Sequence, residues 1–380
     1  MKNTFGQSLQ TTIFGESHGP FIGVVLDGLA PGIEVNDEFI KEKLALRRPS
    51  GAISTARVEA DEYTIASGVF EGKTTGTPLC ILIPNTNTRS KDYDKTGRIA
   101  RPGHADYTAL CKYHGFEDYR GGGHFSGRIT AALVAGGAIA AKALEKKGII
   151  IGTHILKLSD ISDISFEESI KGDSPSASDN KNTKGLSQAI SVLNKKQFAV
   201  LNDEAGEKMQ EAILVASKDS DSVGGILETA IVGIPAGVGE PWFDTVEGML
   251  SHILFSVPGI KGVEFGAGFD KVCARGSEFN DAFRNENGEV VTESNNNGGI
   301  NGGITNGMPI MIKCAVKPTP SIYKEQKSIN LNTLENADLA IEGRHDPAII
   351  HRARVVVDSV CALAVYDMLA MRFGTDYFME

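Results

Sequence analysis

The stretch RPGHADYTALCKYHGFEDYRGGGHFSGR, Arg101 to Arg128, combines a run of three glycines with three of the chain's eight histidines. Gly121, Gly122 and Gly123 can adopt backbone angles closed to other residues, so their N–H groups can converge on one point. The apolar segment 129–148 predicts a buried helix that Ser126 caps. A helix N-terminus beside a glycine nest favours an anion site, and a glycine-rich turn without a ligand is the alternative.

Composition limits the class of protein. The 380 residues are 41% hydrophobic, which is ample for the core of one large or two medium domains. The net charge of −10 argues against a nucleic-acid or anionic-membrane partner, because such partners require a basic surface. Five scattered cysteines without a CxxC pair indicate reduced thiols in a cytosol rather than disulfides or zinc, so we expect no metal. We find no signal peptide and no uninterrupted membrane-spanning segment.

Two histidines fall in loops. His18 lies in GESHGP, between the strand-like segments SLQTTIF and FIGVVLDG, and His104 follows Pro102 and Gly103. Either histidine faces a cleft or lies on a surface turn. A helix predicted over 36–46 ends at Arg47 and Arg48, which can bind an anion or form a solvated basic helix end.

The second half adds three candidate loops. Residues 160–187 form a polar surface excursion, and the glycine-rich run Ser294 to Gly307 predicts a shaped loop close to a ligand. The buried strand MPIMIKCAV leads into the segment 317–321, which suits either a phosphate or flavin contact or an ordinary edge turn. Asp346 before Pro347 predicts a helix N-cap, which is the structural alternative to a catalytic role.

The chain lacks the Walker A, GxGxxG, HExxH and GxSxG signatures. Its loop histidines, aspartate, glycine-rich loops and arginines suit binding a multiply charged anion and moving protons. These residues alone do not identify the reaction.

Six motifs together resemble the chorismate synthase family: FGESHG (14–19), RRP (47–49), RPGHADY (101–107), DYRGGG (118–123), SNNNGGINGGI (294–304) and GRHDP (343–347). The resemblance implies an α+β fold with antiparallel β-sheets sandwiching core α-helices, in one domain over residues 1–380. It implies a carbon-oxygen lyase of the shikimate pathway that converts 5-enolpyruvylshikimate 3-phosphate to chorismate and phosphate by anti 1,4-elimination. The reaction needs reduced FMN without net redox change. A cytoplasmic homotetramer is also expected.

The resemblance assigns roles to single residues. His18 is similar to the acid that protonates the departing phosphate, and His104 to the residue that protonates or stabilises reduced flavin. Asp346 is similar to the aspartate that acts with flavin N5 in removing the substrate proton. The substrate phosphate and carboxylates would be met by Arg48, Arg101 and Arg128. The expected flavin contacts are His124, Phe125, Ser126, Pro258, Gly259, Gly302, Lys317, Pro318, Thr319, Pro320, Ser321 and Arg344, and Arg47 matches a position assigned to NADPH.

The chain departs from the family's usual GGGRSSARET at His124, Phe125 and Ile129. A flavin-storage or anion-binding protein without turnover is a different class of function, and a flavoprotein oxidoreductase is a second kind of enzyme. The presence of His18 and His104 argues against the first. The fate of reduced FMN discriminates the second, because a lyase recycles it and an oxidoreductase consumes it.

Overall fold

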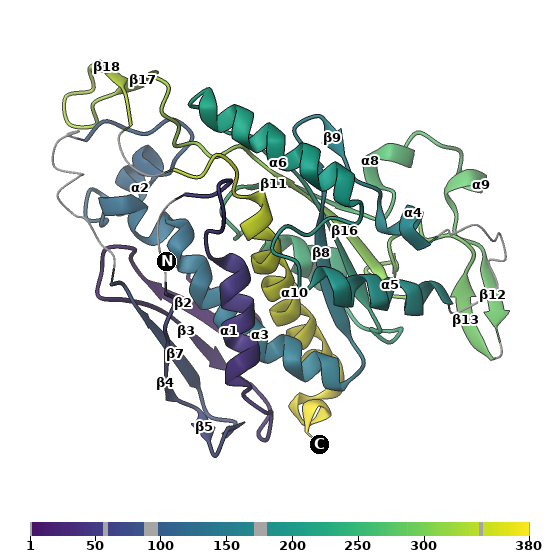
Figure 1. The fold of residues 1–380 in the computed structure, drawn as a ribbon. Coiled ribbons are helices and arrows are strands. Elements are labelled where there is room, and N and C mark those ends of the chain that lie inside the picture. The colour runs from purple at the N-terminus through teal and green to yellow at the C-terminus, as the bar shows by residue number, and fades with distance from the viewer. Residues whose placement is uncertain are drawn as a thin grey trace.

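Two five-stranded antiparallel sheets enclose a layer of long helices (Figure 1). The structure is a computed structural model that describes residues 2–55, 60–86, 98–170, 181–286, 288–341 and 345–379. The layered arrangement is the α+β architecture that the resemblance implied.

The first sheet has the order β1 (Thr4–Phe5), β2 (Gln10–Gly15), β3 (Phe21–Asp27), β7 (Leu79–Pro84) and β4 (Thr64–Ser67). Alternate residues of β7, namely Leu79, Ile81 and Ile83, are fully buried, as expected of a strand with one face on the core. The predicted strand–loop–strand around His18 is confirmed, because β2 pairs with β3 in antiparallel register.

The second sheet has the order β11 (Ile260–Phe265), β16 (Ile310–Val316), β10 (Gly225–Val232), β8 (Ile150–Leu158) and β9 (Ile161–Ser162). Strand β10 contributes to two cores. Leu227 and Ile231 belong to the main core, whereas Ala230 and Val232 pack on the other face of the sheet. Both faces of this sheet are therefore covered.

The helical layer contains α1 (Asp37–Arg47), α3 (Thr130–Lys146) and α10 (Ile350–Phe373). Helix α10 is buried from Val355 to Ala370 and packs on α3, as a helix that is apolar nearly all round must. A Cβ at Gly137 would lie 2.5 Å from Ser359 Cβ, so glycine lets the two helices approach closely. The window Gly127–Lys146 is long and apolar enough to span a membrane, but 83% of it is buried inside the protein, which is typical of a core helix.

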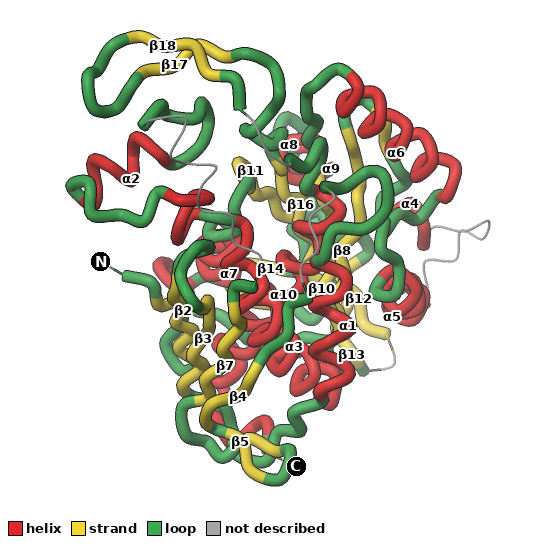
Figure 2. The backbone as a smooth tube through the Cα atoms, turned by 60° about the vertical axis from the view of Figure 1, so that its left-hand side comes forward, coloured by secondary structure: helices red, strands yellow, loops and turns green. Residues whose placement is uncertain are grey.

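Two helices outside this layer, α4 (Phe166–Ile170) and α5 (Lys181–Leu193), pack on the second sheet (Figure 2). Phe166 of α4 and Leu186 and Ile190 of α5 pack on the face opposite α10. The predicted excursion at 160–187 thus includes two packed helices, and its residues 171–180 lie outside the described residues. The remaining helices are α2 (Asp106–Tyr113), η2 (Arg120–Phe125), η3 (Gly127–Ile129), α6 (Asp203–Lys218), η4 (Trp242–Asp244), α7 (Val246–Leu254), α8 (Gly268–Lys271), α9 (Gly276–Phe279) and η5 (Thr375–Phe378).

Four hairpins complete the described strands. They are β5 (Val69–Phe70) with β6 (Lys73–Thr74), β12 (Phe283–Glu286) with β13 (Glu289–Thr292), β14 (Ile300–Asn301) with β15 (Ile304–Thr305), and β17 (Gln326–Ile329) with β18 (Asn336–Leu339).

Candidate active site

The loop between β2 and β3 carries His18 on a tight turn. Gly19 N donates to Glu16 O at 3.0 Å, and Ser17 N donates to Gly123 O at 3.1 Å. Ser17 Oγ lies 3.2 Å from His18 Nδ1. The histidine turn is therefore docked on the glycine run of η2, more than one hundred residues further along the chain.

The glycine run brings His18 and His104 to neighbouring positions. Gly121 and Gly122 have φ of 60° and 87°, a region that disfavours side chains. A Cβ at Gly121 would lie 2.1 Å from His18 Cε1, and a Cβ at Gly122 would lie 2.8 Å from His104 Cε1. The glycines are thus required because two imidazole rings lie against consecutive backbone units, which the sequence interpretation of an anion nest did not anticipate.

His104 is oriented by a carboxylate that Arg101 also holds. Its Nδ1 lies 2.9 Å from Asp106 Oδ1, and Arg101 donates to both oxygens of the same carboxylate at 2.8 and 2.6 Å. Burial alone would raise the pKa of Asp106, but the hydrogen bonds from Arg101 and His104 outweigh it and hold the pKa well below its usual range. The ionised carboxylate accepts a hydrogen bond from Nδ1–H, while Nε2 of His104 has no hydrogen-bond partner among the described residues. His104 therefore presents one free ring nitrogen.

The segment after β16 closes over the His104 loop. Lys317 Nζ donates to Gly103 O at 2.6 Å, and a Cβ at Gly103 would lie 3.2 Å from Pro320 Cβ. Lys317 N donates to Gly259 O at 2.9 Å, which brings the turn of Pro258 and Gly259 to the same place. Burial and the neighbouring charge of Lys261 lower the pKa of Lys317. Three loops that are far apart in sequence thus meet beside His104.

The other residues of the segment 317–321 are partly buried. Thr319 O accepts a hydrogen bond of 2.7 Å from Ser222 Oγ, while Thr319 Oγ1 is buried without a partner among the described residues. Pro318 lines an open groove of about 440 Å³, and Ser321 is half-buried. A buried hydroxyl without a partner is suited to meet a ligand.

Asp346 is not a helix cap. Helix α10 begins at Ile350, its N-cap residue is Ile349, and no side chain caps it, so the predicted capping role of Asp346 is wrong. Instead Asp346 accepts from Thr55 N at 2.8 Å and from an Arg352 guanidinium nitrogen at 2.5 Å. The Asp346 carboxylate therefore binds an arginine of the first turn of α10 and a loop amide instead of the free N–H groups at the start of the helix.

Two of the predicted anion-binding arginines are buried together. Arg47 and Arg128 are 3% and 8% exposed, and both donate to the carboxylate of Asp61. Arg48 is half-buried at the end of α1, and its guanidinium has no hydrogen bond or ion pair with the described residues. Within the described residues, Arg48 thus differs from Arg47 and Arg128 in having an unpaired guanidinium. The predicted flavin contact Arg344 lies outside the described residues.

His124 and Ser126, which follow the glycine run, contact the first sheet and the short helix before α3. His124 Nδ1 lies 2.8 Å from Gly15 O, so it carries a proton and donates to this carbonyl. Phe125 is 37% exposed and makes an edge contact with Tyr113. Ser126 Oγ accepts from Arg128 N at 3.3 Å and caps η3, so the predicted capping position is confirmed for a short helix that precedes α3.

Gly302 lies apart from this cluster. It is exposed at the turn between β14 and β15, and its neighbour Gly303 packs against Thr245 at the start of α7. The contacts of the described residues join this hairpin to α7 and not to either histidine loop.

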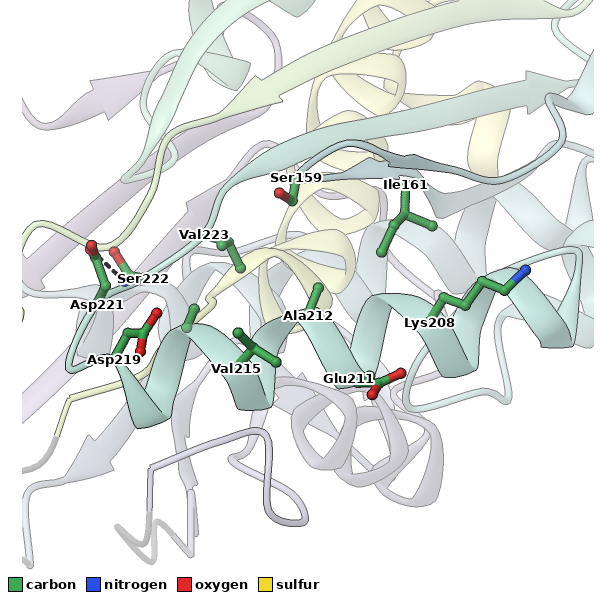
Figure 3. A pocket seen from close by; sticks show the side chains of 11 residues that line it. Ser159, Ile161, Lys208, Glu211, Ala212, Val215, Asp219, Asp221, Ser222 and Val223 are labelled. Carbon is green, nitrogen blue, oxygen red and sulfur yellow. Dashed lines mark hydrogen bonds between the residues drawn. The ribbon is translucent and has the colours of Figure 1, made fainter.

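Figure 3 shows an open groove of about 520 Å³ along α6. It is lined on one side by Lys208, Glu211 and Val215 and on the other by Ser159 and Ile161. Neither His18 nor His104 lines it, so the histidine cluster is a separate place on the molecule.

Sequence reasoning missed three polar residues of the cluster. Asp106 lies two residues after His104, and this spacing at a helix start was a usable signal. His345 lies near Arg101, and burial together with the Arg101 charge lowers its pKa. Asp61 has a positive φ of 51° and a fully buried carboxylate, and nothing in its sequence surroundings distinguishes it.

Comparison with known proteins identifies the family. A family model described as chorismate synthase matches residues 9–370. This chain belongs to the chorismate synthase family. It is 42% identical over 369 residues to the chorismate synthase of Pyrococcus abyssi, with 97% of each chain covered. It is 44% identical over 368 residues to that of Methanosarcina barkeri, which covers 96% of this chain and 95% of the relative.

A solved structure supports the same conclusion. A crystal structure of chorismate synthase superposes with a TM-score of 0.74 at 26% identity and covers 97% of this chain and 94% of the other. The chain is accordingly a lyase of the shikimate pathway that releases phosphate from 5-enolpyruvylshikimate 3-phosphate to form chorismate.

Proposed function

We propose that His18, His104 and Asp346 divide the proton chemistry of the chorismate synthase reaction at this site. The observation that carries the proposal is the placement of two imidazoles on consecutive glycines, with Nε2 of His104 free among the described residues. An imidazole can donate or accept a proton near neutral pH, so one can act as the acid for a departing phosphate.

The residues at the site fit reduced FMN. A phosphorylated, polar cofactor needs cations and hydrogen-bond donors, and the site supplies Arg48, the ammonium of Lys317 and the unpaired hydroxyl of Thr319. Reduced FMN, when bound, supplies the electron-rich flavin that this family's elimination requires. The residues that would hold it are those expected from the resemblance: His124 to Ser126, Pro258, Gly259 and Lys317 to Ser321, with Gly302 and Arg344 as further candidates.

The chain's own residues then bind and orient the substrate. We propose that Arg48 and Arg101 meet its phosphate and carboxylates, because fixed cations offset its charge in a partly buried site. Arg128 is held by Asp61, which also binds Arg47. His18 gives its proton to the departing phosphate, His104 holds a proton at Nδ1 for Asp106, and Asp346 takes the proton that leaves the substrate.

The NADPH assignment rests on Arg47. Because Arg47 is 3% exposed and bound to Asp61, its placement favours support of Arg128 over direct contact with a nucleotide. The position of Arg47 therefore argues against a direct contact between this residue and NADPH. We further propose a cytoplasmic homotetramer. Trp242 and Phe243, which are 85% and 94% exposed on η4, are apolar surface that a neighbouring subunit would cover.

An anaerobic assay tests the function. Purified protein with 5-enolpyruvylshikimate 3-phosphate and dithionite-reduced FMN is expected to form chorismate over many turnovers per flavin, whereas oxidised FMN alone is expected to form none. Turnover with oxidised flavin and no reductant would contradict the proposal. Consumption of one reduced flavin per product would instead identify an oxidoreductase.

A further inference from the structure

The turn that carries His18 is held by Asn85 as well as by the glycine run. Asn85 directly follows β7, the neighbour of β3 in the first sheet. Its main-chain N donates to Pro20 O at 3.1 Å, which continues the strand pairing to the edge of the turn.

The Asn85 side chain spans the turn. Its Nδ2 donates to Glu16 O at 2.9 Å and to Gly19 O at 2.8 Å, the carbonyls on either side of Ser17 and His18. An amide nitrogen has two hydrogens, so both are used. The Glu16 carbonyl also accepts the hydrogen bond that closes the turn, from Gly19 N.

The other end of the amide is tied to the buried charges. Asn85 Oδ1 accepts from Arg128 Nε at 3.2 Å. Two carbonyls on one side and a guanidinium on the other permit only one orientation of the amide, with nitrogen toward the turn and oxygen toward Arg128. Arg128 in turn donates to Asp61, which also binds Arg47.

The network of hydrogen bonds and ion pairs continues to Asp346, another catalytic candidate. Arg352 Nε donates to Arg47 O at 2.7 Å, and the same guanidinium donates to Asp346. A continuous path of hydrogen bonds, ion pairs and one stretch of Arg47 backbone therefore connects the Asp346 carboxylate to the turn that bears His18. Asn85 is the last member of this path before the turn.

We propose that Asn85 is a positioning residue that fixes His18 for proton transfer, a role that rests on the proposed function of His18. Docking on Gly123 through Ser17 N holds the turn on one side only. Without the amide, the carbonyls of Glu16 and Gly19 lose their hydrogen bonds from Asn85 Nδ2, and the turn can shift relative to Arg128. A displacement of about 1 Å of a catalytic group can cost roughly 10²-fold in rate.

The substitution Asn85→Asp separates the two ends of the amide. It keeps an oxygen acceptor for Arg128 and replaces both donors by an oxygen that faces the two carbonyls. We expect kcat to fall about 100-fold while KM changes less than about 3-fold, because Arg128 stays bound. A loss confined to KM, or unchanged kinetics, would overturn the proposal.

A matched control is Asn194→Asp on the second sheet. Asn194 Nδ2 also donates to a main-chain carbonyl, Ile151 O, at 2.9 Å, and within the described part of the chain Asn194 has no hydrogen bond to the histidine loops. This variant loses the same kind of bond, so it is expected to lower the melting temperature without changing kcat. If both variants lower kcat equally, Asn85 has only a structural role.

A double-mutant cycle tests whether Asn85 acts through His18. In a His18→Ala background, Asn85→Asp should lower the residual kcat less than about 2-fold, because the group that it positions is gone. An undiminished 100-fold loss in that background would contradict the proposal. Asn85→Ala, which introduces no charge, gives the same comparison if the aspartate variant does not fold.

The cycle also distinguishes this proposal from the role of His18. Full turnover of His18→Ala would remove the proposed acid and the positioning role with it. A strongly impaired His18→Ala beside a fully active Asn85→Asp would leave the acid in place and reject only Asn85.

Discussion

His104 and His154 are both bound to carboxylates, but their surroundings differ. His104 has an exposed fraction of 16% for its side chain, one carboxylate partner and a free Nε2 among the described residues. His154 has none of its side chain exposed, and both ring nitrogens are used, at 3.1 Å to Asp163 and 2.8 Å to Glu228.

The difference separates a histidine with an available ring nitrogen from one with both ring nitrogens bound. Burial alone would lower the pKa of His154, but the hydrogen bonds to Asp163 and Glu228 outweigh it and raise the pKa. Glu228 also accepts from Phe166 N, and Asp163 accepts from Leu201 N. Through these two carboxylates, His154 connects strands β8 and β10 to the start of α4 and to the chain before α6. Neither of its ring nitrogens is left to bind a ligand.

The largest expected effect contrasts the two histidines directly. His104→Ala should lower kcat by roughly 10²- to 10⁴-fold, the usual contribution of acid–base catalysis. His154→Gln, which keeps one donor for a carboxylate, should leave kcat unchanged. Steady-state kinetics with reduced FMN, together with circular dichroism of both variants, measures this. Equal losses of kcat in the two folded variants would contradict the prediction that His104, and not His154, takes part in turnover.

A smaller effect is expected for the carboxylate that orients His104. Asp106→Asn removes the charge that holds Nδ1–H and Arg101, and asparagine can donate to Nδ1 and so reverse the tautomer. We expect kcat to fall about 10- to 100-fold. Asp338→Asn is the control, because Asp338 binds the exposed Lys327 on the β17–β18 hairpin and should have no effect on kcat. An Asp106→Asn enzyme as active as that control would show that His104 needs no orienting carboxylate.

The smallest effect is on stability and depends on pH. The raised pKa of His154 means that its stabilisation is fully present below its ordinary pKa of about 6.5 and is lost as pH rises through the higher folded pKa. The free energy of unfolding of the native protein should exceed that of His154→Gln by about 1–3 kcal/mol at pH 6, and by less at pH 9. Urea unfolding at the two pH values measures the difference. A difference that grows with pH would mean that His154 is neutral in the folded state.

Strongly periodic segments were predictable from the sequence. The helix expected over 36–46 is α1 (Asp37–Arg47), and the apolar segment 129–148 contains α3 (Thr130–Lys146). Their apolar positions are close together in sequence, so local pattern suffices to locate them. The start of α10 was not predictable in this way, because Asp346 and Pro347 form a good local helix start that Arg352 and Thr55 override by binding the carboxylate.

The sequence by itself determined the family and the loops that hold the candidate residues, because these lie in contiguous motifs whose residue types are typical of acid–base chemistry and anion binding. Only the tertiary structure decided which of these groups are paired with one another and which are buried. Local sequence predicted Arg47 and Arg128 to be anion-binding residues, but both bind the carboxylate of Asp61. It predicted the glycine run to be an anion nest, but His18 lies against Gly121 and His104 against Gly122. The physical reason is that burial and pairing depend on partners distant in the chain, such as Asp61 for Arg128 and Asn85 for the His18 turn, and no local pattern specifies those partners.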